Sequence, residues 1–207
     1  AGDASPGGND VIYAGAGNDK VDGGAGNDVI FGEGGVDNIQ GGTGNDTIIG
    51  GDGRDGLFGE AGSDYLDGGA EDDSLYGDDG NDILIGGAGV DTIYGGAGRD
   101  TYIYNRGDEA DIIVDTNTEG NTLRFGTGIS SSDITLRLGS LKLDLGNGDE
   151  IHLINPGQAN GFNQNDVFNS SVIDSFEFAD GTVLSTGELL ARGKHRTLGA
   201  ANDVSYG

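Results

Sequence analysis

The sequence contains no cysteine, methionine or tryptophan, and it has only two prolines among its 207 residues. The lack of cysteine excludes disulfide bridges and thiolate metal sites. Hydrophobic residues make up only 34% of the chain, and no run approaches the roughly 18 consecutive apolar residues that a membrane-spanning helix needs. An ordinary two-layer core is therefore not expected, and the fold needs another source of stability.

Positive charge is also scarce, because 10 Lys and Arg oppose 36 Asp and Glu and the formal net charge is -26. This charge would repel nucleic acid phosphates and anionic membrane surfaces, and it opposes compaction of the chain through self-repulsion. Cations are therefore the expected partners. The chain begins without Met, without a signal-peptide pattern and inside a repeat, so we expect it to be part of a longer protein.

Glycine is abundant, with 44 copies, and much of it follows a period of nine residues. Two residues after each periodic Asp stands an apolar residue, from Ile12 to Tyr102, and two residues before it stands Gly, except at Glu71. The consensus of the eleven units is GGxGxDxUx, where U is apolar. The periodic residues are Asp10, Asp19, Asp28, Asp37, Asp46, Asp55, Asp64, Asp73, Asp82, Asp91 and Asp100.

Each unit divides into a three-residue strand, xUx, and a six-residue turn. Neighbouring strand side chains point to opposite faces, so each strand places one side chain inward. Glycine tolerates positive φ and lets carbonyls crowd around a centre, and Asp adds a carboxylate; calcium accepts oxygens of both kinds. The candidate metal ligands are the eleven Asp residues and the turn glycines Gly24, Gly26, Gly42, Gly44, Gly51, Gly53, Gly87, Gly89, Gly96 and Gly98.

These units resemble the RTX nonapeptide, the haemolysin-type calcium-binding repeat of bacterial exported proteins, over about residues 7 to 103. The resemblance implies a parallel β-roll in which two units form one coil and calcium ions lie between turns eighteen residues apart. Up to about nine ions would fit, and we expect fewer because Glu71 replaces a turn glycine and the end turns lack a neighbour. The resemblance also implies type I secretion machinery as a partner and a secreted or cell-surface location.

After Tyr102 the period ends, and longer alternating strands with hairpin turns follow. We predict an all-β fold with a calcium-bound two-sheet roll at 1–103, an antiparallel β-rich cap with a short C-terminal helix at 104–191, and a linker with the start of a degenerate repeat at 192–207. Hairpin turns are expected at Gly139-Ser140, Asn147-Gly148 and Ala179-Asp180-Gly181. Ser185 and Glu188 predict a capping box for a helix that stops at Gly193. Residues 104 to 191 resemble the region that often follows RTX arrays.

The outward positions of one predicted sheet are unusually apolar. They include Val29, Phe31, Ile49, Ile83 and Ile85. Our hypothesis is that this face is covered, either by the C-terminal part of the chain or by a protein partner. The alternative is that β-branched and aromatic residues simply favour strands.

Catalytic motifs are missing, since His152 and His195 are far apart and no nucleophile elbow or phosphate-binding loop is found. We therefore expect this segment not to be an enzyme. The favoured function is a calcium-binding module that folds outside the cell as part of a larger type I-secreted protein, while the ion-free chain is expected to be disordered. The alternatives are a calcium-rigidified segment of an adhesin or S-layer protein, and the C-terminal export region of a secreted protease, lipase or toxin.

Overall fold

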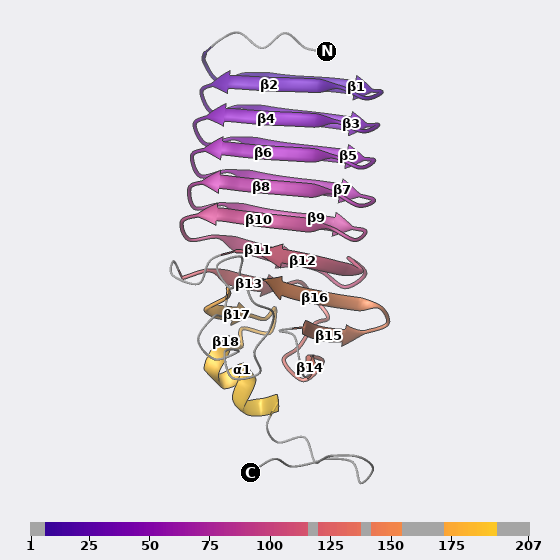
Figure 1. Cartoon of the computed structure of the whole chain (residues 1–207), viewed down its shortest axis with the longest axis vertical. Coiled ribbons are helices and arrows are strands. Elements are labelled where there is room, and N and C mark those ends of the chain that lie inside the picture. The colour runs from indigo at the N-terminus through magenta and orange to yellow at the C-terminus, as the bar shows by residue number, and fades with distance from the viewer. Residues whose placement is uncertain (1–6, 116–119, 138–141, 155–171, 194–207) are drawn as a thin grey trace.

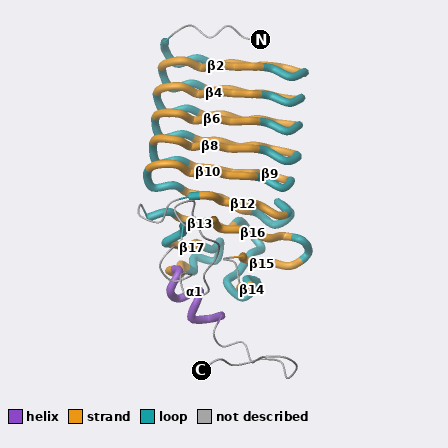
Figure 2. Tube along the Cα trace, viewed as in Figure 1, coloured by secondary structure: helices purple, strands orange, loops and turns teal. Residues whose placement is uncertain are grey.

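The computed structural model describes residues 7–115, 120–137, 142–154 and 172–193. In the repeat array, two parallel sheets lie face to face, and the strands of each sheet stack like rungs (Figures 1 and 2). The first sheet contains β1 (Val11–Ala16), β3 (Val29–Gly34), β5 (Thr47–Asp52), β7 (Tyr65–Ala70), β9 (Ile83–Ala88) and β11 (Thr101–Tyr104). The second contains β2 (Lys20–Ala25), β4 (Asn38–Thr43), β6 (Gly56–Ala61), β8 (Ser74–Asp79) and β10 (Thr92–Ala97). The predicted parallel β-roll is therefore confirmed.

Each strand of the array pairs in parallel with the strand that follows eighteen residues later, as Ile12 pairs with Ile30 and Ile30 with Ile48. The U side chains consequently form the core between the two sheets. They are the buried residues Ile12, Val21, Ile30, Ile39, Ile48, Leu57, Leu66, Leu75, Leu84, Ile93 and Tyr102. One such side chain contributes about 2 kcal/mol per unit, whereas ordering nine residues costs about 1 kcal/mol or more each. This core alone does not stabilise the roll.

The strands are longer than the three residues expected from the sequence. In the first pair, Gly15 pairs with Glu33 and Ala16 with Gly34, after a break opposite Ala14. The expectation was wrong because consecutive turns on one side are near copies of each other. Their backbones therefore stay in register and continue the parallel ladder into the turn.

Parallel stacking also continues beyond the last periodic unit. The first sheet is extended by β13 (Thr122–Phe125) and β17 (Ser175–Glu177), and the second by β12 (Ala110–Val114) and β16 (Asp149–Ile154). Antiparallel pairing is confined to the end of the stack, where β14 (Thr135–Arg137) and β15 (Lys142–Gly146) follow β16, and β18 (Val183–Ser185) follows β17. Helix α1 (Thr186–Gly193) ends the described chain.

Local predictions for the cap can be checked individually. Asn147 and Gly148 have positive φ in the β15–β16 hairpin, as expected for that turn. The capping box forms, since Ser185 N–H donates to Glu188 Oε2 at 2.9 Å and Glu188 N–H donates to Ser185 Oγ at 3.3 Å. The Gly139-Ser140 turn and the degenerate repeat in the tail lie outside the described residues. Within the described part, no helix is long and apolar enough to cross a membrane.

The apolar outer face of the first sheet is not covered by the described C-terminal elements, which lie beyond the last repeat rung instead (Figure 1). Tyr13 is 61% exposed and Ile83 is 36% exposed. Phe31 is partly covered by Tyr13, whose ring stacks on it at a centroid distance of 5.0 Å. The described C-terminal strands lengthen the two sheets rather than fold back over this face. A protein partner on this face stays a prediction.

Candidate metal centres

The periodic Asp residues form two ladders, one along each edge of the roll. From Asp28 and Asp37 onward, each carboxylate accepts, through Oδ1, a hydrogen bond from the backbone N–H of the Asp eighteen residues earlier. Asp46 N–H donates to Asp64 Oδ1 at 2.7 Å, and Asp55 N–H donates to Asp73 Oδ1 at 2.7 Å. The first-side ladder contains Asp10, Asp28, Asp46, Asp64, Asp82 and Asp100, and the second-side ladder contains Asp19, Asp37, Asp55, Asp73 and Asp91.

The second oxygen of these carboxylates is buried without a hydrogen bond. This holds for Oδ2 of Asp28, Asp37, Asp46, Asp55, Asp64, Asp73, Asp82 and Asp91. Their side chains are at most 3% exposed. A buried charge with no partner is strongly unfavourable, so each of these oxygens calls for a cation.

The space beside each Oδ2 is a cradle that a methyl group would fill. A Cβ added to Gly59 would lie 2.5 Å from Asp64 Oδ2 and 2.8 Å from the carbonyl oxygen of Gly77 in the next turn of the same side. Within the described ranges, no group of three or more acidic, His or Cys side chains could hold a metal ion. The carboxylates therefore need backbone carbonyls as co-ligands, which is the mixed oxygen set that calcium prefers.

The first glycine of each motif was missed as a candidate by the sequence analysis. Gly59 lies beside Oδ2 of Asp64, and the carbonyl oxygen of Gly59 lies beside Gly41 in the preceding turn of the same side. The same arrangement repeats at Gly23, Gly32, Gly41, Gly50, Gly68 and Gly77. The signal was present, because this position is the first G of GGxGxD.

The ten predicted ligand glycines occupy the two left-handed positions of each turn. Gly24 has φ 94° and Gly26 has φ 134°, and the carbonyls of both face the glycines of the next stacked turn, Gly42 and Gly44. Glu71, the exception in the period, keeps the left-handed conformation at φ 78°. The turn path is thus preserved at Glu71, and the number of ions stays a prediction.

Comparison with known proteins agrees with this geometry. The family described as RTX calcium-binding nonapeptide repeat (4 copies) matches residues 7–39, 31–66 and 67–102. Residues 7–102 are an RTX repeat array.

Among solved structures, the extracellular lipase LipA from Serratia marcescens is similar to this chain, with 16% sequence identity and a TM-score of 0.30. The match covers 78% of this chain and 38% of the lipase, so the chain spans well under half the length of that protein. A search among curated proteins finds no match.

Burial shapes the electrostatics of the RTX array. It raises the pKa of Asp64 to about 6, that of Asp82 to about 7 and that of Asp73 to about 8, against the backbone hydrogen bond that lowers each of them. Repulsion from neighbouring carboxylates adds to the increase. Without cations, these three carboxyls therefore bind protons at a higher pH than an ordinary Asp does.

A second ladder runs along the outside of the first-side turns and uses the residue before each Asp. The Oδ1 atom of Asn27 accepts a hydrogen bond from Asn45 N–H at 3.0 Å, and that of Asn45 accepts one from Ser63 N–H at 2.9 Å. These bonds run in the opposite sense to those of the Asp ladder. They explain why Asn is frequent at this position, which the consensus left as x.

Replacing Asn45 with Ala is expected to destabilise the ion-loaded array by about 1 kcal/mol, because the Ser63 N–H loses its acceptor at an exposed site. Chemical unfolding in saturating calcium measures this change. Asn38→Ala is the matched control, since Asn38 is an exposed side chain on β4. Equal unfolding midpoints for both variants would show that the ladder adds nothing.

The first-side ladder ends at Asn121, where an amide takes the Asp position. Asp100 N–H donates to Asn121 Oδ1 at 2.9 Å, as in the repeats, but Asn121 Nδ2 donates to Asp115 Oδ2 at 2.7 Å and to the Val172 carbonyl at 3.2 Å. Tyr102 OH also donates to Asp115. At this rung, the side chains of Asn121 and Tyr102 thus donate hydrogen bonds to the Asp115 carboxylate. The turns of the array instead leave a carboxylate oxygen buried without a hydrogen-bond donor.

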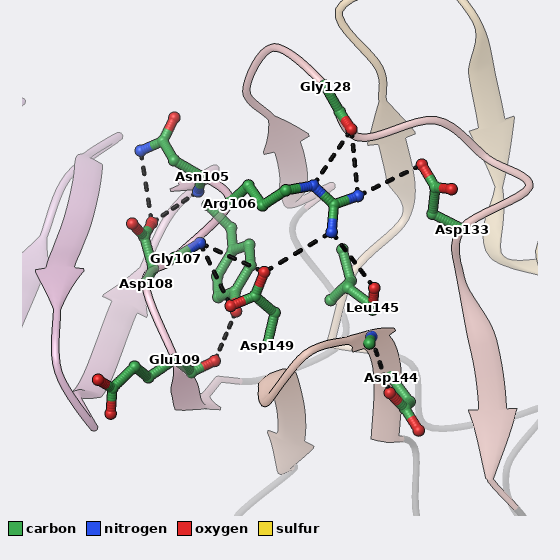
Figure 3. A network of polar contacts seen from close by, with 12 residues as sticks. Asn105, Arg106, Gly107, Asp108, Glu109, Gly128, Asp133, Asp144, Leu145 and Asp149 are labelled. Carbon is green, nitrogen blue, oxygen red and sulfur yellow. Dashed lines mark hydrogen bonds and ion pairs between the residues drawn. The ribbon is translucent and has the colours of Figure 1, made fainter.

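The second-side ladder continues to Asp111, whose Oδ1 accepts from Asp91 N–H at 3.1 Å. Beyond it lies Arg106, whose guanidinium donates to the carbonyls of Gly128 and Leu145 and lies 3.8 Å from the carboxylate of Asp149 (Figure 3). Carbonyls and carboxylates are also the oxygens that calcium takes. At this end of the stack, the positively charged guanidinium of Arg106 contacts oxygens of these same kinds.

Proposed function

We propose that this chain is a calcium-responsive folding module of a larger bacterial protein that is exported by a type I route and works outside the cell. The buried, unpartnered Oδ2 atoms of the two Asp ladders carry this proposal. Oxygens that accept no hydrogen bond are tolerated in a dry stack only if a cation accompanies them.

The two carboxylate oxygens of a ladder Asp have different roles in calcium binding. Each ladder carboxylate uses Oδ1 to fix the preceding turn and presents Oδ2 to the cradle, where a carbonyl of the next turn also points. About nine bound divalent ions would offset about 18 of the 26 excess negative charges. Because adjacent gaps share ligands, an ordered turn provides part of the calcium site of the next turn. Folding of the array and calcium binding are therefore coupled.

This coupling suits export in the unfolded state. The chain would stay unfolded where calcium is scarce and fold where calcium is millimolar. Shared carboxylates supply little charge per ion, so we expect affinities in the weak extracellular range, roughly 10⁻⁴ to 10⁻³ M. We propose that the segment is a structural module rather than an enzyme.

Circular dichroism of the isolated chain in excess chelator is expected to show little β structure, and millimolar calcium is expected to restore it in one cooperative transition. The restored signal should disappear again when chelator is added. Magnesium at the same concentration is the control, since it demands an octahedral site and gives up its waters reluctantly. The same β signal in chelator and in calcium would refute the proposal.

A second candidate function is a calcium-stiffened segment of an adhesin or S-layer protein. The exposed Val11 and Tyr13 favour it, as does the aromatic column on the second sheet, where Tyr76 stacks on Phe58 at 4.8 Å and on Tyr94 at 4.6 Å. Such faces associate when they are presented on a rigid rod. Concentration-dependent association in calcium, and none in chelator, would distinguish this function from that of a folding module alone.

A further inference from the structure

The last cradle on the first side differs from the cradles before it in the oxygen that faces it. In the preceding cradle, a Cβ added to Gly77 would lie 2.5 Å from Asp82 Oδ2 and 2.5 Å from the Gly95 carbonyl oxygen. Both distances lie in the range that calcium keeps from its oxygen ligands. At Gly95 the corresponding position lies 2.5 Å from Oδ2 of Asp100 and 2.5 Å from Oδ2 of Asp115. A side-chain carboxylate of the cap therefore stands where the array places a backbone carbonyl.

The atom nearest to this position at Gly95 is the hydroxyl of Tyr102. Tyr102 is the U residue of the last repeat unit, and the U residues before it are aliphatic. In the unit of Ile30, the side chain ends in a Cδ1 methyl group that lies 3.2 Å from the same position at Gly23. A phenol is longer than an isoleucine side chain, so its hydroxyl reaches into the space that the methyl group only borders. The Tyr102 hydroxyl therefore fills the last cradle.

Hydrogen bonds hold the hydroxyl in this place. Tyr102 OH donates to Asp115, and Asn121 Nδ2 donates to Asp115 Oδ2 at 2.7 Å. The side chains of Tyr102, Asp115 and Asn121 are at most 3% exposed. Hydrogen bonds to a charged group in a dry environment are stronger than those between neutral groups in water. The two donors therefore stabilise the charge of Asp115, as a bound cation would.

Asn121 supports the same conclusion because it lies at the ladder position itself. Its Oδ1 accepts a hydrogen bond from Asp100 N–H at 2.9 Å, as a ladder Asp does. The second terminal atom of a ladder Asp is a carboxylate oxygen, whereas that of Asn121 belongs to an NH₂ group, which donates hydrogen bonds and does not bind cations. The calcium ion that the repeat pattern implies between stacked turns thus does not fit the residues at this junction.

We propose that the Tyr102 hydroxyl takes the place of a calcium ion in the last first-side cradle, so that the row of ions on this side ends before the cap. This inference rests on the proposed calcium binding of the array. It assigns Tyr102 a role that the aliphatic U residues do not have, because its ring belongs to the core while its hydroxyl belongs to the metal-binding edge. Removing the two donors to Asp115 should then create a calcium site that the wild type lacks.

Two variants remove these donors in steps. Tyr102→Phe removes the hydroxyl and keeps the ring, and Y102F/N121D also replaces the NH₂ group with a carboxylate oxygen. Tyr104→Phe is the matched control, since Tyr104 is a buried residue of the same strand. Its hydroxyl donates to the carbonyl of Glu109, which also accepts a hydrogen bond from Glu150 N–H at 2.8 Å. Equilibrium dialysis at saturating calcium counts the ions bound per chain.

The combined variant is expected to bind about one more calcium ion per chain than the wild type, because Asp115 then faces a second buried carboxylate and requires a cation. Tyr104→Phe should bind the same number as the wild type. An unchanged number in the combined variant would overturn the inference, since the cradle would then either hold an ion already or attract none. A smaller number would also overturn it, because Tyr102 or Asn121 would then be a calcium ligand.

Hydrogen exchange provides a second test that does not require the combined variant to fold. Asp115 N–H donates to the Ile154 carbonyl at 3.0 Å, so its exchange rate measures opening of the junction. In Tyr102→Phe this rate should rise about tenfold or more, since a buried charge loses a hydrogen bond. The rate should fall again when calcium is raised above the concentration that saturates the wild type. In Tyr104→Phe, the exchange rate should not respond to this additional calcium.

The response to additional calcium separates a stand-in for an ion from an ordinary buried hydrogen bond. If exchange in Tyr102→Phe is as insensitive to calcium as exchange in Tyr104→Phe, the assignment of Tyr102 is wrong. A wild-type chain that binds no calcium at all would instead refute the proposed function. The two failures are therefore distinguishable.

Discussion

Asp64→Asn is expected to raise the calcium midpoint of folding at least about tenfold, since removing one partner of a buried charge pair typically costs several kcal/mol. The substitution is nearly isosteric. The amide oxygen still accepts the hydrogen bond that Asp46 N–H donates to Oδ1, but an NH₂ group replaces the buried Oδ2. An NH₂ group carries no lone pair for a cation, so the gap beside Asp64 loses its carboxylate.

The position of Asp64 makes this effect large. It lies in the middle of the first-side ladder, with Asp46 on one side and Asp82 on the other. In a repeat array, each turn is stabilised by its neighbours, so a defect at the centre divides the stack into two short pieces. The calcium transition should therefore become less steep as well as shifted.

Asp22→Asn is the matched control for this experiment. Asp22 is an exposed residue of β2 that points away from the core, and its substitution removes the same charge. The control should fold at a calcium concentration close to that of the wild type. Asp64→Asn with the midpoint and steepness of Asp22→Asn would show that Oδ2 of Asp64 is not a ligand.

The sequence predicted Asp64 and the other ladder residues because the array has strict geometry. Two nine-residue units make one coil, so any insertion would displace all later Asp residues from the stack. An unbroken spacing of nine therefore implied contacts between residues eighteen apart. The Oδ1 hydrogen bonds occur at that separation.

The spacing of nine residues did not predict the ladder residues beyond the end of the array. Asp111 follows Asp91 by twenty residues and Asn121 follows Asp100 by twenty-one, yet both continue the hydrogen-bond ladders. A local signal remained, since each is followed two residues later by a buried apolar side chain, Ile113 or Leu123. The insertions concealed this signal, and with it the parallel pairing of β12 with β10 and of β13 with β11.

Other features depended on conformations that residue type alone does not reveal. A glutamate at φ 78° is unusual enough that the sequence indicated an interruption at Glu71 rather than a preserved turn. The role of Arg106 could not be predicted either, because its acceptors Gly128 and Leu145 are 22 and 39 residues away along an irregular chain. Contacts of that kind follow from the folded cap and not from a period.

Acidifying the ion-free chain from pH 8 to pH 5 is expected to increase its β structure substantially. The folded pKa is about 8 for Asp73, about 7 for Asp82 and about 6 for Asp64, whereas an unfolded Asp titrates near about 3.9. The ion-free roll therefore binds protons that the unfolded chain does not bind. Its stability is greatest below about pH 4 and is lost as the pH rises through about 6 to 8.

Calcium and protons should then substitute for each other at the ladder carboxylates. At pH 8 the chain should depend most strongly on calcium, because its ion-free stack carries charged, unpartnered Oδ2 atoms. At pH 5 calcium should add less β structure and should release protons as it binds. Circular dichroism in chelator, combined with proton-release measurements in weak buffer, tests both parts.

Two controls make the pH experiment specific to the buried ladders. Sedimentation at each pH excludes association, and the range stops at pH 5 because the sequence pI is about 4.1. Asp73→Asn should lose the part of the transition that lies nearest pH 8, since it removes the carboxyl with the highest pKa among the three ladder residues. A chelated chain that is equally unfolded at pH 5 and pH 8 would contradict the prediction. Burial of neutral carboxyls would then be too weak to replace the cation, and calcium would be the only means of stacking the turns.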